Sequence, residues 1–331
     1  MSEQSAHLFA EFNPPSYEEW VEATVKSLKG RPLSTLTSRT VEGIEIRPFY
    51  TQADIADLPH LNSQPGQPPY LRGSNAHSQP WLIAQPLPYA TPQQFNDALL
   101  EDLRRGQTAV HLDPNATKIK NLADLSIALN GVDFAAAPIF IARGQASLPL
   151  VPLLANHLQK TEQPLSSLQG GLFHDPLAAL ARHGGAVDDD LYAESAKLMG
   201  WAVENAPNFT TIGVDTAVYH NGGANAVQQL AFALATAVQH IRSLQKQGLD
   251  IGQIASQLRF VFAIGGDFFM EIAKLRAARL LWAQVVQAFG GDATAQKMQI
   301  HGETAVANKS RLDPHVNMLR TTTETLAAAV G

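Results

Sequence analysis

Short apolar runs alternate with amphipathic helical patterns from Pro80 to the end of the chain. Apolar residues three and four positions apart predict helices, and the clearest example spans Val227 to Ile241. The apolar runs between the helical patterns predict seven strands. These are Thr108–Leu112, Leu125–Leu129, Pro138–Ala142, Gly171–His174, Thr211–Val218, Leu258–Ile264 and Met298–His301.

Repeated alternation of strands and helices predicts a parallel sheet with right-handed crossovers. Seven candidate strands fit a (β/α)8 TIM-type barrel better than a three-layer sandwich. The chain stops just after a helix-like stretch, Asn317–Val330, whereas a closed barrel needs an eighth strand. Either the sequence is a piece of a longer protein, or the last strand comes from elsewhere.

The first 70 residues have a different pattern. Ser16 and Glu19 form a capping box that predicts the start of a helix. Apolar residues between Thr40 and Tyr50 predict a strand or a hairpin around Gly43. The following stretch is rich in proline, glycine, serine and asparagine, which predicts irregular structure. We therefore expect residues 1–70 to form an extended N-terminal arm that wraps a neighbour, and residues 71–331 to form the barrel.

The composition narrows the possible partners and compartments. Charged residues make up 16% of the chain, against about 25% in typical proteins, so part of the surface is expected to be covered by another domain or subunit. Glutamine-rich faces would also explain the deficit. The net charge of −6 gives no electrostatic footprint for nucleic acid. The chain has no cysteine, so disulfides and zinc–thiolate sites are excluded. With no signal-peptide pattern and no apolar run of about 20 residues, we expect a soluble cytoplasmic protein.

Polar residues follow several predicted strands, where active sites of (β/α) barrels lie. His220, His301 and Glu303 would meet across one mouth of the barrel as acid–base or hydrogen-bonding groups. The alternative is that each of them satisfies backbone groups of its own loop. The sequence contains no dinucleotide-binding, Walker-type or His-Glu-x-x-His motif, so it gives no sign of the chemistry that these motifs support.

The segment Gly266–Trp282 carries the strongest resemblance to a known family. Its Phe-Phe-Met-Glu-x-Ala-Lys-Leu-Arg-Ala-Ala-Arg core resembles the adenosylcobalamin-dependent acyl-CoA mutases of the methylmalonyl-CoA mutase type. Tyr219-His220 with the glycine-rich turn after it is similar to that family's tyrosine–histidine strand end. Two further segments, Arg72-Gly73 before Pro80-Trp81 and Asp313–Thr322, match in the expected order.

The resemblance implies a barrel that binds acyl-CoA along its axis. In the family, a separate C-terminal domain binds cobalamin through an Asp-x-His-x-x-Gly motif, and the cofactor supplies the radical chemistry. That motif does not occur in this sequence. We therefore expect the cobalamin-binding domain to be absent here, and adenosylcobalamin to be carried by a partner chain.

Departures from the family pattern lie at the reacting centre. The interval between Gly73 and Pro80 lacks the tyrosine of the active chain, and Gly222-Gly223 replaces an expected glutamate. Glu303 stands where the active chain carries glutamine. This pattern, and the segment Thr40–Tyr50, resemble the small, non-catalytic subunit of heterodimeric members of the family. The implied role is to pack against the catalytic large subunit and to support the isomerisation of methylmalonyl-CoA and succinyl-CoA.

A second reading keeps the chain catalytic. It would be the substrate-binding barrel of a related acyl-CoA mutase, with cobalamin on another chain. His220 would then polarise the thioester carbonyl, with Tyr219 and Glu303 nearby. Under the first reading, the same three residues are vestiges of an active site.

Overall fold

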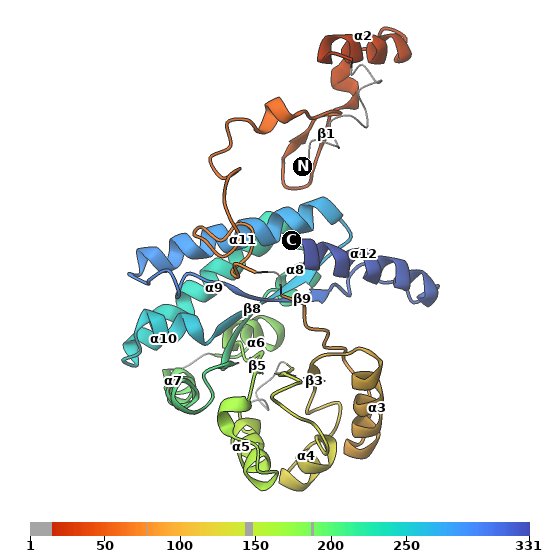
Figure 1. The fold of residues 1–331 in the computed structure, drawn as a ribbon. Coiled ribbons are helices and arrows are strands. Elements are labelled where there is room, and N and C mark those ends of the chain that lie inside the picture. The colour runs from red at the N-terminus through yellow and green to blue at the C-terminus, as the bar shows by residue number, and fades with distance from the viewer. Residues whose placement is uncertain (1–14, 78, 143–147, 187–188) are drawn as a thin grey trace. The chain divides into compact units, whose positions relative to one another are not determined.

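The computed structural model describes residues 15–77, 79–142, 148–186 and 189–331 (Figure 1). The chain divides into two compact units, Met1–Leu61 and Asn62–Gly331. The sequence led us to expect an arm of residues 1–70, and its first 14 residues lie outside the described ones.

The order of the elements alternates strands and helices through the second unit. The helices are α2 (Tyr17–Ser27), α3 (Pro92–Arg105), α4 (Leu122–Ala128), α5 (Leu150–Lys160), α6 (Pro176–His183), α7 (Asp189–Asn205), α8 (Ala217–Asn221), α9 (Ala226–Lys246), α10 (Ile251–Ser256), α11 (Phe268–Ala288) and α12 (Asn317–Val330). The strands are β1 (Ser38–Arg39), β2 (Glu45–Ile46), β3 (Val110–Leu112), β4 (Ile139–Ile141), β5 (Gly170–Leu172), β6 (Phe209–Thr210), β7 (Ile212–Asp215), β8 (Leu258–Ile264) and β9 (Gln299–Thr304).

The first unit contains the predicted helix and hairpin. The Ser16 hydroxyl accepts a hydrogen bond from Glu19 N at 3.1 Å, and Ser16 N donates to Glu19 Oε2 at 2.7 Å, so the capping box is confirmed. Strands β1 and β2 pair antiparallel, with Ser38 opposite Ile46. The turn between them includes Gly43 at a φ of +83°, a left-handed conformation that favours glycine.

The described residues of the first unit, 15–61, form no hydrophobic core of their own. Not one of residues 15–61 is buried within the chain. Its best-packed group is an aromatic stack in which the ring centroids of Trp20 and Phe49 lie 4.6 Å apart, with Tyr17 stacked beside them. Small domains are stabilised by buried apolar surface, and residues 15–61 bury little of it among themselves.

The second unit is built on parallel strands that follow chain order. One sheet has the order β3-β4-β5-β6 and the other β7-β8-β9, and every pair in them is parallel. Only Thr211 separates β6 from β7, and Gly213 N donates to His174 O at 2.8 Å, so this segment joins the two sheets. A parallel bridge from Pro86 to His111 places one more extended segment beside β3.

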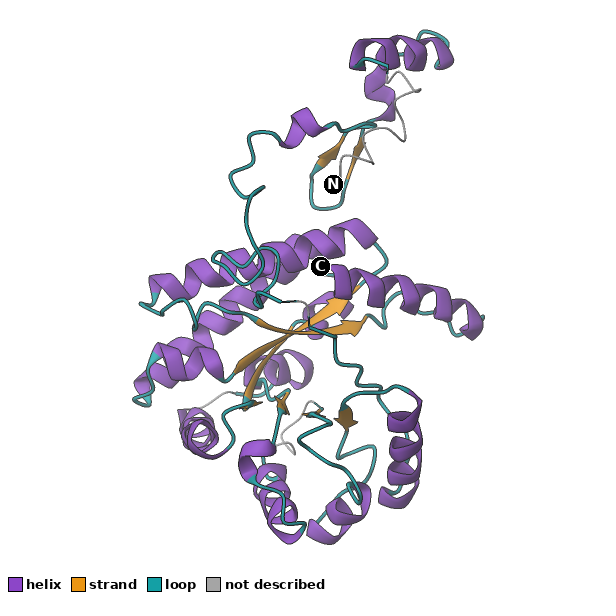
Figure 2. Ribbon diagram, viewed as in Figure 1, coloured by secondary structure: helices purple, strands orange, loops and turns teal. Residues whose placement is uncertain are grey.

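Helices cover one face of these strands. The sheet is curved, so that side chains on its other face approach one another. On the helix side, Phe260 and Phe262 of β8 pack with Trp282 of α11. On the opposite side, the rings of Phe140 on β4 and His301 on β9 lie 5.1 Å apart, although several strands separate them in the sheet order. Figure 2 shows these strands at the centre, with the helices around them. Such cross-sheet contact is typical of a curled parallel sheet.

Most predicted elements of the second unit are confirmed, and one is wrong. Leu125–Ala128 lie in helix α4 and Leu129 is its C-cap, so this run does not form a strand. Asn121 caps that helix, because its side chain accepts a hydrogen bond from Asp124 N at 3.0 Å, and Leu125 and Ala128 turn their buried faces to the core. The α/β architecture with parallel sheets is therefore confirmed, whereas closure into an eight-stranded barrel stays a prediction.

No helix among the described residues is both long enough and apolar enough to span a bilayer. The expected cytoplasmic location stays a prediction.

Candidate functional site

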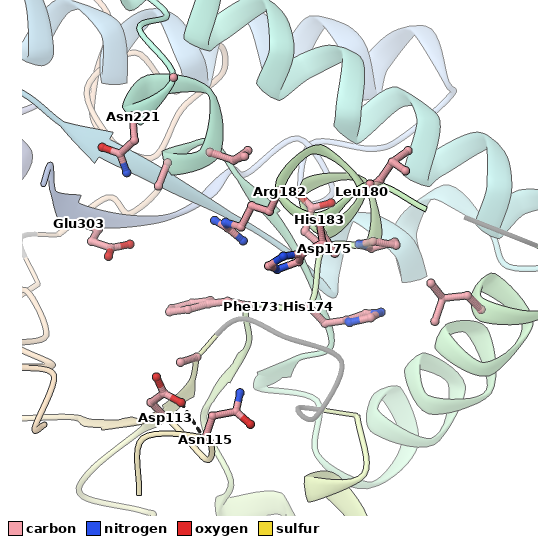
Figure 3. A pocket seen from close by; sticks show the side chains of 18 of the residues that line it. Asp113, Asn115, Phe173, His174, Asp175, Leu180, Arg182, His183, Asn221 and Glu303 are labelled. Atoms are coloured by element: carbon pink, nitrogen blue, oxygen red, sulfur yellow. Dashed lines mark hydrogen bonds between the residues drawn. The ribbon is translucent and has the colours of Figure 1, made fainter. Parts of the chain in front are cut away.

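The carboxyl ends of the parallel strands meet at a cavity of about 1090 Å³. We call it the mouth cavity. Figure 3 shows the polar side chains around it, which come from segments far apart in sequence. They are Asp113 and Asn115 after β3, His174 and Asp175 after β5, Arg182 and His183 on α6, Asn221 on α8 and Glu303 on β9. Concave sites of this kind at strand ends are where parallel α/β folds bind ligands.

Asp175 anchors the wall of the mouth cavity. Its Oδ1 caps α6 by accepting hydrogen bonds from Leu177 N and Ala178 N, and its Oδ2 accepts one from Asp215 N at 2.8 Å. The Nε2 of buried His240 lies 3.2 Å from Asp175 Oδ1. Burial alone would raise the pKa of Asp175, but the contact with His240 and the backbone donors lowers it below its ordinary value.

The positively charged side chain of Arg182 lines the mouth cavity. Its guanidinium pairs with the carboxylate of Asp215, a residue that is fully buried. Asp215 Oδ1 also accepts a hydrogen bond from Ala217 N at 3.0 Å, which fixes the carboxylate at the end of β7. Figure 3 shows Arg182 reaching from α6 toward the space above Phe173. The pair therefore ties α6 to the end of the sheet.

His174 is buried beside this network, only 3% exposed, and its Nε2 has no hydrogen-bond partner among the described residues. Burial and the neighbouring His240 lower its pKa to about 4. The imidazole is therefore neutral at physiological pH.

Aromatic rings fill the space beneath the mouth cavity, between the curled strands. The ring centroids of Phe173 and His301 lie 4.6 Å apart, and that of Phe140 lies 5.9 Å from Phe173. The guanidinium of Arg259 lies 5.2 Å from the centroid of the Phe140 ring and donates to Gln299 Oε1 at 2.8 Å. We call these four side chains, Phe140, Phe173, His301 and Arg259, the axial plug.

The structure separates the three residues that the sequence singled out as a site. Glu303 lines the mouth cavity. His220 does not line it, since its ring packs behind Gly265, where an added Cβ would lie 3.2 Å from His220 Cε1 and 3.3 Å from Glu271 Oε1. Burial and nearby Lys274 lower the pKa of His220. His301, expected in the mouth, belongs to the axial plug.

Tyr219 faces away from the mouth cavity. Its hydroxyl lies 3.0 Å from Thr236 Oγ1 on α9, and its ring packs against Phe232. Burial raises the pKa of this hydroxyl. The predicted strand Thr211–Val218 ends at Asp215, so Tyr219 and His220 lie on helix α8 instead of at a strand end. The hydrogen bond from Ala217 N to the Asp215 side chain turns the chain there.

Asp215 and Arg182 are site residues that the sequence did not reveal. Arg182 lies in a short helix, and Asp215 lies inside an apolar run, where only its burial makes it notable. A local signal was present only for Asp175, because Asp-Pro directly after a strand is typical of a helix N-cap followed by proline at the first helical position. Among the described residues, no cluster of three or more His, Asp or Glu side chains could hold a metal ion.

A family model described as methylmalonyl-CoA mutase matches residues 39–118 and 115–331, which is most of the chain. The chain belongs to the methylmalonyl-CoA mutase family. The match includes both the hairpin of the first unit and the whole sheet of the second.

Relatives within the family include both kinds of subunit. The methylmalonyl-CoA mutase small subunit of Streptomyces virginiae is 35% identical over 98% of this chain and 53% of its own length. The small subunit of Porphyromonas gingivalis is 32% identical over 100% of this chain and 54% of its own. The large subunit of Streptomyces virginiae is 29% identical over 96% of this chain and 47% of its own length. The chain spans about half the length of the curated relatives it matches.

Proposed function

We propose that this chain is the barrel part of a methylmalonyl-CoA mutase small subunit without an active site of its own. It supports the isomerisation of methylmalonyl-CoA and succinyl-CoA by packing against a catalytic large subunit. An eighth strand from elsewhere in the protein would close the curled sheet into the barrel.

The axial plug is the observation that carries this proposal. A substrate that runs along a barrel axis needs open space between the inward-facing side chains. Here Phe140 and Phe173 are 3% and 2% exposed, and the His301 ring lies against both of them, tilted by 57° and 59°. Arg259 continues the plug, with hydrogen bonds to Thr210, Gly170 and Gln299. An extended acyl-CoA chain would have to displace these side chains.

The residues present do not fit a cobalamin site either. Near the carboxyl ends of the strands, His174 is buried with a pKa of about 4, and the ring of His301 lies within the axial plug. His220 packs against Gly265 beside the Glu271 carboxylate. We therefore place adenosylcobalamin on the partner chain and derive no step of the reaction through it.

The exposed apolar side chains among the described residues of the first unit support the proposal of a protein partner. Its exposed apolar side chains include Ile44, Ile46, Phe49 and Tyr50, at 38–50% exposure, on and after the β1–β2 hairpin. A surface of this kind is stabilised when another chain covers it. Since the family has large and small subunits, the large subunit is the partner that we propose.

Charge placed on the hairpin tests the partner contact. Replacing both Ile44 and Ile46 with aspartate should weaken the complex with the large subunit by about tenfold or more, because two apolar anchors are lost and two charges must be desolvated. Isothermal titration calorimetry of the two subunits measures this change. Glu45→Gln, which lies between the two positions, is the matched control and should leave the affinity within about twofold. Equal affinity of the aspartate variant and the unsubstituted subunit would remove the hairpin from the interface.

Acyl-CoA binding tests the axial plug. The subunit alone is expected to show no calorimetric binding of methylmalonyl-CoA, whereas the large subunit binds it. Stoichiometric binding by this chain, lost in His220→Ala, would favour the catalytic reading instead.

A further inference from the structure

Helix α6 has a hollow on each of its two faces. One face lines the mouth cavity with Ala179, Leu180 and Arg182. The adjacent face, with Leu177, lines a second hollow of about 360 Å³ against Phe232 of α9, and Leu180 lies between the two and lines both. Only Pro176 and Ala178 of this helix are buried. The helix therefore gains little stability from packing.

The two ends of α6 are held differently. At its start, Asp175 caps the helix and is itself bonded to the backbone of β7, so this end is fixed to the sheet. At its end, Gly184 and Gly185 have φ values of +70° and +102°. An added Cβ at either glycine would meet no atom of the described residues within 4 Å. Glycines in open space readily absorb a change of backbone direction.

The ion pair between Arg182 and Asp215 joins the far end of α6 to the sheet. Arg182 is in the last turn, and its partner Asp215 is fully buried at the end of β7. The side chain of Arg182 is 29% exposed, so the pair sits at the border between protein and solvent. A buried carboxylate that loses its cationic partner is strongly unfavourable, which makes this contact decisive for where the helix rests.

We infer that the C-terminal half of α6 is a lid over the mouth cavity, latched by the ion pair between Arg182 and Asp215. When this ion pair opens, the helix rotates about its fixed N-terminal end at Asp175. Leu180 then no longer lines either hollow. The lid then controls access from solvent to the mouth cavity and to the small residues at its base, such as Ala217. This inference does not depend on the proposed subunit role.

The absence of cysteine from the 331 residues of this chain allows a direct test in it. Ala217→Cys places one thiol at the base of the mouth cavity, where Ala217 is 4% exposed. Ala237→Cys, in the core of α9 at 0% exposure, reports global unfolding instead. The rate of modification by a thiol reagent is compared with and without the latch.

The latch is best removed as a pair, by Arg182→Gln with Asp215→Asn, because this leaves no buried charge unpaired. We expect the thiol at position 217 to react roughly tenfold faster in that background, with the thiol at position 237 unchanged. Hydrogen exchange of the α6 amides should rise in parallel. Arg104→Gln, which breaks the exposed pair with Glu101 on α3, should change neither rate.

Two results would overturn the inference. An unchanged rate at position 217 in the latch-free background would show that α6 does not gate the cavity. An equal acceleration at positions 217 and 237 would show that the pair stabilises the whole domain instead of a lid.

Discussion

Replacing Lys274 with methionine is expected to lower the free energy of unfolding by about 3–5 kcal/mol. The ammonium group of Lys274 is buried in the second unit, with a side-chain exposure of 0%. It pairs with Glu271, donates to Ala263 O at 2.7 Å and bonds to Gln229 Oε1, so it joins α11 to β8 and α9. Its removal leaves the buried Glu271 carboxylate and Gln229 Oε1 without their ammonium partner, whereas Ala263 O keeps a hydrogen bond from Gln229 Nε2 at 3.2 Å.

Urea denaturation of the single variants measures this effect. Lys246→Met, at an exposed position in the last turn of α9, is the matched control and should cost less than about 1 kcal/mol. Combining Lys274→Met with Glu271→Gln should recover part of the loss, because the uncompensated charge is gone. A loss of less than about 1 kcal/mol for Lys274→Met alone would show that the contacts of Lys274 do not stabilise the domain as proposed.

Acidification is expected to destabilise the domain through His174. Its pKa is about 4 in the folded chain, below the ordinary histidine value of 6.5. The unfolded state therefore binds a proton at higher pH than the folded state does, and stability falls as pH drops from about 6.5 toward 4. This single residue should make the domain about 2 kcal/mol less stable at pH 5 than at pH 7.

The unfolding free energy at both pH values, with and without His174→Gln, isolates this contribution. Glutamine keeps a polar side chain in the buried site and does not titrate, so the difference between pH 5 and pH 7 should shrink by about 2 kcal/mol. His315→Gln, in a segment where His315 is exposed, serves as the matched control and should leave the pH dependence unchanged. An identical pH dependence in His174→Gln and the unsubstituted protein would assign acid sensitivity to other groups, of which His240 and Asp175 are the nearest.

Elements with a strong local signal could be predicted from the sequence. The strand Leu258–Ile264 and the helix Asn317–Val330 were predicted with the bounds that the structure has. In both, the apolar pattern matches the type of element that forms. The Ser16 capping box is likewise a contact within three residues, which is visible in any window of the sequence.

Errors arose where a short apolar run fits either type of element. Leu125–Leu129 has the composition of a buried strand, but its neighbours Asn121 and Asp124 provide a cap, and the run belongs to α4. Such short runs cannot be assigned by periodicity alone. The end of β7 was overestimated for a similar reason, because Ala217 and Val218 continue the apolar pattern into helix α8.

The candidate site depended on tertiary structure that the sequence does not show. Arg182 and Asp215 are 33 residues apart, and their pairing follows from the position of α6 over β7. Phe140 and His301 meet only because the sheet curls. Polar residues after the strands were sufficient to predict a candidate site at the carboxyl ends of the strands, and Glu303 does line the mouth cavity there. They were not sufficient to show that His220 and Tyr219 point elsewhere.

Mutase turnover of the complete two-subunit complex tests the central claim most directly. If this chain has no active site, His220→Ala and Glu303→Gln in it should each leave the rate of methylmalonyl-CoA isomerisation within about twofold, at saturating adenosylcobalamin and with subunit association confirmed. General acid–base or carbonyl-polarising groups typically contribute about 100-fold or more. A loss of that size in either variant, with the complex intact, would contradict the account and place a working active site on this chain.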